Sequence, residues 1–184
     1  MPTEAEKRLR RCCFCGPSQE GMDFYENEVL DWLEPQVRQA VRDGYRTFLC
    51  GMRKGVDLQA GHMIREIKEK DSSIRLICVE PWPGLSEKWD YIWQSPHDFL
   101  MDVSADHVKV FSKTYYPGVL READEYLVDH CARLVAYYDD KTDEIWEMMA
   151  YAVRQGVEVV TNRPDLVRDY RAALERPGKY GLPE

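Results

Sequence analysis

The sequence predicts an α/β protein with a Rossmann-like three-layer fold, in which helices cover both faces of a mostly parallel sheet. Short apolar segments alternate along the chain with segments of helical apolar spacing, which predicts about six strands joined by helical crossovers. The 184 residues suffice for one core of ordinary size but not for two comfortable domains. We therefore expect a charged N-terminal segment over residues 1–10, a single domain over 11–175 and a loosely ordered tail over 176–184.

Each expected strand is a short run rich in β-branched, aromatic or cysteine residues, bounded by turn-forming residues. These runs predict strands at residues 11–15, 48–50, 74–79, 107–111, 133–138 and 157–161.

The expected helices show apolar residues at three- and four-residue intervals. They are predicted at residues 24–42, 56–70, 86–101, 119–130, 142–155 and 164–174. Proline has no backbone N–H, so Pro35 is expected to kink or divide the first helix and Pro96 to interrupt the third. Thr142 or Asp143 is expected to cap the fifth.

The composition disfavours several classes of protein. With 33 acidic and 25 basic residues the formal net charge is -8, and such a surface repels polyphosphates, so general nucleic-acid binding is not expected. No apolar run is long enough to cross a bilayer, and residues 1–10 resemble no secretory signal. We expect a cytoplasmic protein without a membrane partner, and the sequence leaves a homo-oligomer open.

The six cysteines are expected to be reduced residues of the core, since most lie in or beside apolar segments. Cys12 and Cys15 form a nominal C-x-x-C pair, but residues three apart on a strand face opposite sides of the sheet. There is no second pair, and the four histidines are scattered singly. No metal site is expected.

The most informative stretch follows the second predicted strand. Gly51 and Gly55 suit a strand-to-helix turn, and the first N–H groups of the next helix favour an anion. Arg53 and Lys54 between the glycines could bind a phosphate, and Asp57 could contact a ribose, act as a base or simply cap the helix. An ordinary turn with two solvated cations uses the same residue types, so both interpretations stay open.

The other loops after predicted strands are further candidates, because α/β sheets bind ligands there. Glu80 could act as a general base, although Glu-Pro-Trp-Pro also suits a rigid turn. Several aromatic residues could stack on a base or simply fill the core, namely Trp82, Trp89, Tyr115 and Tyr116. The dinucleotide fingerprint and the P-loop motif are both absent, so no cofactor is expected.

The order of motifs resembles the SLOG superfamily, which includes the SMF/DprA and Lonely Guy proteins, and within it the small YpsA-like proteins of unknown function. The resemblance covers residues 11–162 and rests on Cys-Cys-Phe-Cys-Gly at 12–16, residues 44–60, Glu-Pro-Trp at 80–82, and residues 105–108 and 126–130. It implies a Rossmann-like domain that binds a nucleotide or nucleotide-derived small molecule. The positions carried over from the family motifs are Gly16, Gly51, Gly55, Asp57, Asp129 and Thr142.

The chain also departs from the family pattern. The first loop usually continues Thr-Gly-His-Arg-Pro, but here Gly16 is followed by Pro17-Ser18. The usual Arg-Asn pair before the late aspartate is Ala123-Asp124, and the usual Gly-Gly-Thr after strand five reads Asp-Lys-Thr at 140–142. The glutamine expected after strand three is Leu85, and the phosphoribohydrolase signature is absent.

Three functions remain as hypotheses. The first is binding or sensing of a nucleotide-derived small molecule. The second is hydrolysis of an N-glycosidic or phosphate bond in such a molecule, with Asp57, Glu80 or Asp124 as the candidate carboxylate. The third is a protein-interaction domain whose ancestral ligand site has degenerated. The sequence does not decide whether the protein is an enzyme.

Overall fold

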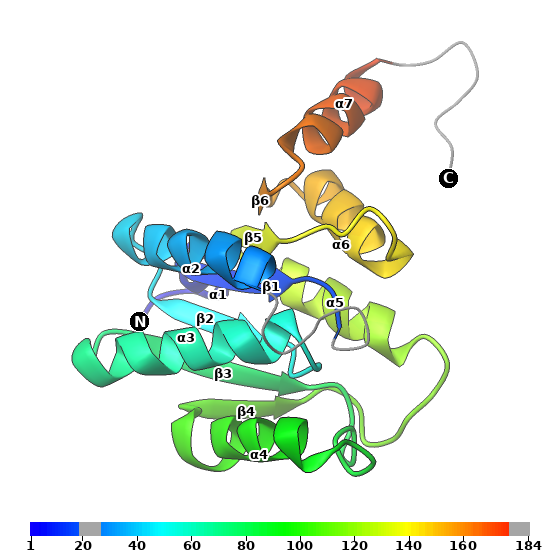
Figure 1. Ribbon diagram of the computed structural model, residues 1–184. Coiled ribbons are helices and arrows are strands. Elements are labelled where there is room, and N and C mark those ends of the chain that lie inside the picture. Colours follow the sequence, from blue (N-terminus) through cyan, green and yellow to red (C-terminus); the bar gives the residue numbers. More distant parts are fainter. Residues whose placement is uncertain (19–26, 177–184) are drawn as a thin grey trace.

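A parallel six-stranded sheet forms the centre of the molecule, as predicted. The computed structural model describes residues 1–18 and 27–176. The strands run in the order β4-β3-β2-β1-β5-β6, and every pair is parallel (Figure 1). Their bounds are β1 Arg11–Cys15, β2 Thr47–Cys50, β3 Arg75–Glu80, β4 His107–Val110, β5 Arg133–Ala136 and β6 Glu158–Thr161.

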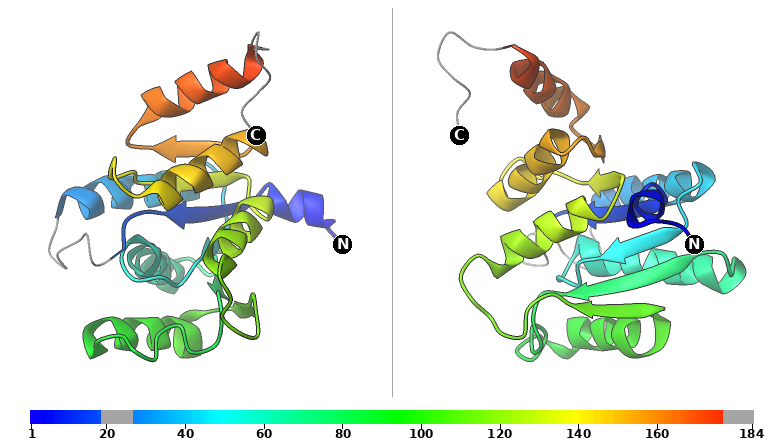
Figure 2. Two further views of the ribbon diagram at one scale, coloured as in Figure 1. Left: turned by 90° about the vertical axis from the view of Figure 1, so that its right-hand side faces the viewer. Right: turned by 180° about the vertical axis from the view of Figure 1, so that it is seen from behind.

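Helices alternate with the strands along the chain. Their bounds are α1 Glu4–Arg8, α2 Asn27–Arg42, α3 Val56–Lys70, α4 Tyr91–Phe99 with the π-helical turn η2 Leu100–Ser104, α5 Val119–Asp129, α6 Asp143–Arg154 and α7 Pro164–Glu175. Helices α2, α3 and α4 cover one face of the sheet, and α5 and α6 cover the other (Figures 1 and 2). Both faces are therefore buried, as apolar parallel strands require.

Two apolar cores flank the sheet, and β1 contributes to both. Cys12 and Phe14 pack with α2 and α3, whereas Cys13 and Cys15 pack with α5 and α6. This alternation confirms that Cys12 and Cys15 face opposite sides. All six cysteines are free and buried.

The connection through α5 reverses the direction in which strands are added to the sheet. The chain proceeds from β1 to β4 in one direction and then returns through α5 to β5, on the other side of β1. The strand order therefore reverses between β1 and β5, and the carboxyl ends of these strands form the topological switch point.

Several expectations about the helices were wrong. Helix α4 begins at Tyr91, five residues later than expected, after turns over residues 81–90. Neither Pro35 nor Pro96 ends its helix.

Helix α1 was not anticipated within the charged start of the chain. Thr3 and Glu6 form a reciprocal capping box there, which is a signal that the sequence contained. The predicted first helix included residues 24–26 and the predicted tail included residues 177–184, which lie outside the described residues. Among the helices of the described ranges, none has the length and apolar character to cross a membrane.

Candidate functional site

The structure gathers the nominated residues at the carboxyl edge of the sheet, with one exception. Gly16 follows β1, the turn from Gly51 to Asp57 links β2 to α3, Glu80 closes β3, and Thr142 precedes α6. These positions lie along the carboxyl edge from β3 to β5, a stretch that includes the switch point between β1 and β5.

Asp129 is the exception. It is the last residue of α5, shortly before β5 begins, and so lies at the opposite edge of the sheet, where strands start. Its side chain is exposed, and its Oδ1 accepts a hydrogen bond from the Tyr151 hydroxyl at 2.8 Å. The structure does not bring Asp129 together with the other nominated residues.

The turn after β2 is tightly packed and has unusual backbone angles. Met52 is fully buried with a φ of 66°, and Gly55 has a φ of 89°. A Cβ atom at Gly55 would lie 2.3 Å from the carbonyl oxygen of Pro17, so only glycine fits there. Likewise a Cβ atom at Gly16 would lie 2.5 Å from the Val56 side chain. The loops after β1 and β2 are thus in direct contact.

Asp57 does not cap α3, contrary to one interpretation of the sequence. Gly55 occupies the N-cap position and Asp57 lies in the first turn of the helix. The Asp57 carboxylate accepts hydrogen bonds from the backbone N–H of Arg53 at 3.3 Å and from its Nε at 3.0 Å.

Arg53 bridges two buried carboxylates. Beyond Asp57, its Nη1 lies 3.1 Å from Asp124 Oδ2 and its Nη2 lies 2.7 Å from Asp124 Oδ1, a bidentate geometry. The side chains of Asp57 and Asp124 are 3% and 9% exposed, so Arg53 is not an ordinary solvated cation. We call Arg53, Asp57 and Asp124 the arginine cluster.

The arginine cluster has distinctive electrostatics. Burial raises the pKa of Asp124 to about 6, against the opposing effect of the Arg53 guanidinium. Burial by itself would lower the pKa of Arg53, but Asp124 and Asp57 together raise it. A buried carboxyl group whose pKa lies near neutral pH is the kind of group that acts as a general acid or base.

A second cluster, with His97 and Glu80 buried and Asp98 exposed, lies at the end of β3. His97 of α4 places Nε2 2.8 Å from Glu80 Oε2 and Nδ1 2.9 Å from Asp98 Oδ1. Burial would lower the pKa of His97, but its hydrogen bonds to the Glu80 and Asp98 carboxylates raise it overall. We call these three residues the histidine cluster. Glu80, nominated as a general base, is therefore already engaged by an imidazole.

Lys54 belongs to the surroundings of the histidine cluster. Its Nζ lies 5.4 Å from the centre of the Trp89 ring, and the edge of that ring packs on His97 at 5.4 Å between centroids. Trp89 thus contacts the Lys54 ammonium group and the buried His97 imidazole, so its ring already packs on groups of the protein.

The loop after β5 is organised by Asp139. Its Oδ1 accepts hydrogen bonds from the N–H groups of Lys141 and Thr142 at 3.0 and 2.8 Å, and its Oδ2 accepts one from the Thr142 hydroxyl at 2.6 Å. Burial would raise the pKa of Asp139, but these hydrogen bonds lower it. Thr142 is the N-cap residue of α6, as predicted, yet its side chain donates to Asp139 and makes no cap bond.

The nominated aromatic side chains mostly pack on protein groups. Trp82 lies against Tyr115 with ring centroids 5.1 Å apart, and the Tyr116 hydroxyl donates to Glu122. Different aromatic residues approach the switch point.

Tyr137 and Tyr138 come directly after β5, beside the end of β1. The Tyr137 ring lies 5.5 Å from Trp32 of α2, and the Tyr138 ring lies 6.3 Å from Trp146 of α6. The sequence analysis placed both residues inside the predicted strand 133–138 and did not select them, whereas β5 ends at Ala136 and leaves them in the loop that follows.

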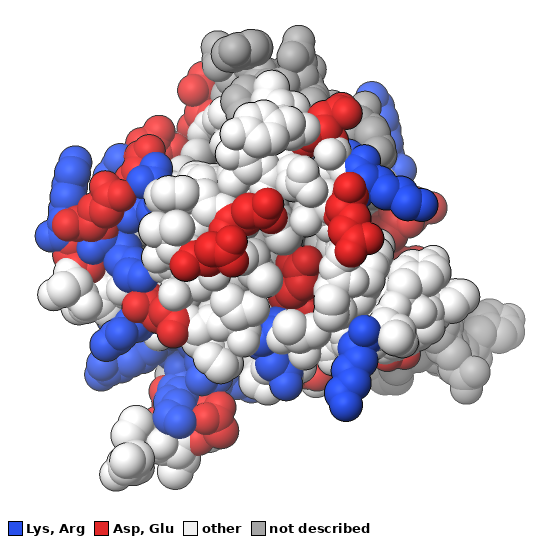
Figure 3. All heavy atoms as spheres, turned by 90° about the horizontal axis from the view of Figure 1, so that it is seen from below, with Lys and Arg blue, Asp and Glu red and all other residues white. Residues whose placement is uncertain are grey.

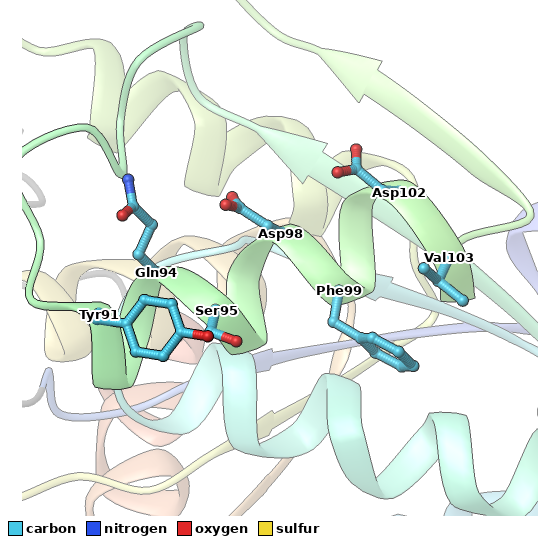
Figure 4. Close-up of a pocket in the computed structure, with 7 residues that line it drawn as sticks. All are labelled: Tyr91, Gln94, Ser95, Asp98, Phe99, Asp102 and Val103. Carbon is cyan, nitrogen blue, oxygen red and sulfur yellow. The ribbon is translucent and has the colours of Figure 1, made fainter.

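Two shallow hollows lie away from the strand ends. One, of about 260 Å³, is formed by Tyr91, Gln94, Ser95, Asp98, Phe99, Asp102 and Val103 (Figure 4). The face that carries it is largely uncharged with acidic side chains across it (Figure 3). The other, of about 230 Å³, lies between α2 and α3. Over residues 1–18 and 27–176, no three His, Cys, Asp or Glu side chains are grouped as metal ligands.

Comparison with known proteins identifies relatives of this chain. The sequence profile of the YspA SLOG family matches residues 26–162, more than half of the chain. UPF0398 proteins from Staphylococcus aureus strains JH9, JH1 and Mu3 are each 22% identical to it over 117 residues. These similarities cover 62% of this chain and 62% of each relative. The profile match includes every residue of the arginine and histidine clusters but not Gly16.

Proposed function

Because the chain belongs to the YspA SLOG family, we propose that it binds or senses a nucleotide-derived small molecule at the carboxyl ends of its sheet strands. The fold supports the proposal, since open α/β sheets bind ligands beyond these ends, where the strand order reverses. In this chain that point lies between β1 and β5.

The arginine cluster beneath the turn after β2 is the observation that carries the proposal. Buried ion pairs contribute little net stability, and a non-glycine residue with positive φ is strained. Both features occur together at Met52, Arg53 and Asp57, next to the switch point. Such costly arrangements concentrate at sites that bind ligands or perform chemistry.

The proposed site comprises the loops that meet at this edge. Gly16, Gly51 and Gly55 allow the close approach of the two loops, and a Cβ atom at Gly51 would lie 2.7 Å from Asp57 Oδ2. Arg53 and Asp57 form its base. Lys54, Glu80 and Thr142 lie around it, whereas Asp129 is too far along α5 to belong to it.

A hydrolase is the second candidate function, favoured by one observation. The pKa of Asp124 is raised to about 6, which suits a general acid or base at neutral pH. The hydrolase hypothesis requires that a ligand reach a carboxylate whose two oxygens now accept hydrogen bonds from Arg53.

Calorimetry with AMP, ADP, NAD, ADP-ribose and cyclic nucleotides tests the proposal, followed by chromatography of the incubated compounds. We expect saturable binding that weakens at least tenfold in Arg53→Lys, which keeps the charge but loses the bidentate geometry. Arg38→Lys is the matched control, because the Arg38–Glu34 pair is exposed on α2. New products that vanish in Asp124→Asn would favour the hydrolase. No binding at millimolar concentration would contradict the proposal and favour a protein-interaction domain.

The same proposal places the protein in the cytoplasm, where nucleotide-derived metabolites occur and thiols stay reduced. Six free, buried cysteines are consistent with that compartment.

A further inference from the structure

Several groups at the strand ends that could bind a phosphate are already paired with oxygen atoms of the protein itself. Phosphates are bound by backbone N–H groups at helix N-termini, by hydroxyl groups and by guanidinium groups. Among the residues that the structure describes, three sets of such donors at this edge are paired with protein oxygen atoms: the starts of α6 and α3 and the side chain of Arg53.

At the start of α6 the donors converge on Asp139. The two backbone N–H groups of Lys141 and Thr142 and the Thr142 hydroxyl all donate to this one carboxylate, at 2.6 to 3.0 Å. This set of donors resembles a phosphate site, and Asp139 provides the anion.

At the start of α3 the loop after β1 covers the turn. The N–H of Val56, the first residue of the helix, donates to the Pro17 carbonyl at 3.3 Å. The backbone of Pro17 and Ser18 packs directly on Gly55, so close that a Cβ atom there would lie 2.3 Å from the Pro17 oxygen. No phosphate fits between these two loops in this arrangement.

Arg53 is paired on both sides. Its Nε and both Nη atoms donate to Asp57 and Asp124, so one positive charge faces two carboxylates. The remaining cation of the turn, Lys54, lies over the Trp89 ring. Both cations of this turn therefore already have a partner within the protein.

We infer that the site selects a nucleoside or nucleobase derivative that carries no phosphate, an inference that rests on the proposed function. The hydroxyl groups of ribose and the amino groups of bases are hydrogen-bond donors, which carboxylates accept.

Titration calorimetry with adenosine, guanosine, cytidine and uridine, each beside its 5′-monophosphate, tests this inference on the full-length protein. We expect at least one nucleoside to bind about tenfold more tightly than its monophosphate. A monophosphate that binds as tightly as its nucleoside, or binding only of phosphate-containing compounds, would overturn the inference and leave the proposed function intact. Failure of every compound would contradict this inference, whereas the proposed function is contradicted only if the wider panel of nucleotides also fails to bind.

Two variants distinguish the effect of occupied hydrogen-bond donors on phosphate affinity from the effect of net charge. Asp139→Ala frees the donors of Lys141 and Thr142, so we expect the affinity for the monophosphate to rise at least fivefold while that for the nucleoside stays the same. Asp140→Ala is the matched control, since it removes the same charge from the neighbouring residue without freeing those donors. Equal gains in the two variants, or no gain in Asp139→Ala with circular dichroism unchanged, would contradict the role of Asp139.

Discussion

The arginine cluster and the histidine cluster share one plan, a cation between two carboxylates at the carboxyl edge of the sheet. Arg53 lies between Asp57 and Asp124, and His97 lies between Glu80 and Asp98. Arginine stays protonated at any physiological pH, whereas histidine titrates. The group that titrates is therefore Asp124 in the arginine cluster and His97 in the histidine cluster, so a change in pH affects the two clusters differently.

The clusters also differ in what they connect. Asp57 belongs to α3 on one face of the sheet and Asp124 to α5 on the other, so Arg53 links the two helical layers across the strand ends. His97 connects β3 to α4, which covers one face of the sheet, and so it contacts only one of the two helical layers. Removing the cation should consequently have a larger effect in the arginine cluster than in the histidine cluster.

Replacing Arg53 with methionine is expected to have the largest effect. It leaves two buried carboxylates without a counter-charge, which lowers the free energy of unfolding by roughly 3–5 kcal/mol. Urea denaturation measures this loss. Arg38→Met removes an exposed pair on α2 and should cost less than about 1 kcal/mol. Equal losses of unfolding free energy in the two variants would contradict the prediction that the buried arginine cluster matters more for stability than an exposed ion pair.

The pH dependence of Asp124 should come next in size. Its pKa is raised to about 6 in the folded protein, so its contribution to stability is full below pH 3.8 and is lost as the pH rises through 6. The difference of roughly two units corresponds to about 3 kcal/mol. Asp124→Asn resembles the protonated form, so its stability relative to the wild type should rise by up to that amount between pH 4 and 7.

Denaturation curves at both pH values, with exposed Asp102→Asn as control, measure this difference. A stability difference between Asp124→Asn and the wild type that does not change with pH would refute the assignment.

His97→Gln should have a smaller effect, in a higher pH window. The pKa of His97 is raised above 6.5, so its contribution is full below pH 6.5 and falls as the pH rises through the folded pKa. At pH 6 the variant should lose roughly 1–2 kcal/mol with its hydrogen bonds, and much less at pH 9. Thermal unfolding across this range tests the prediction. His107→Gln on exposed β4 serves as control and should show the wild-type profile.

Lys54→Met is expected to have the smallest effect. It removes the cation over the Trp89 ring and should cost about 0.5–1 kcal/mol. Lys141→Met, an exposed position in the loop after β5, provides the comparison. A loss of unfolding free energy as large as that of Arg53→Met would contradict the view that the contact with the Trp89 ring is the main interaction of Lys54.

Local signals in the sequence predicted the fold and the edge of the sheet where the proposed site lies. Gly51, Gly55 and the apolar strand before them identify a strand-to-helix turn without any knowledge of the rest of the chain. The late start of α4 was predictable too, since Asp90 is a typical N-cap residue before Tyr91. These features depend on neighbours in the chain.

The partners within the two clusters could not be predicted. Arg53 and Asp124 are 71 residues apart, and Glu80 and His97 are 17 residues apart, so only the docking of α5 and α4 brings them together. His97 was one of four scattered histidines with no local feature to distinguish it. Spacing in the sequence does not reveal contacts that depend on tertiary packing.

The link that Arg53 makes between the two layers has a kinetic consequence. Arg53 can meet Asp124 only after β2, α3 and α5 have all docked, so this contact should form late in folding. Interactions absent from the transition state govern how fast a protein unfolds. Arg53 would then set the lifetime of the folded protein, and stopped-flow measurements on Arg53→Met should show faster unfolding with little change in the refolding rate.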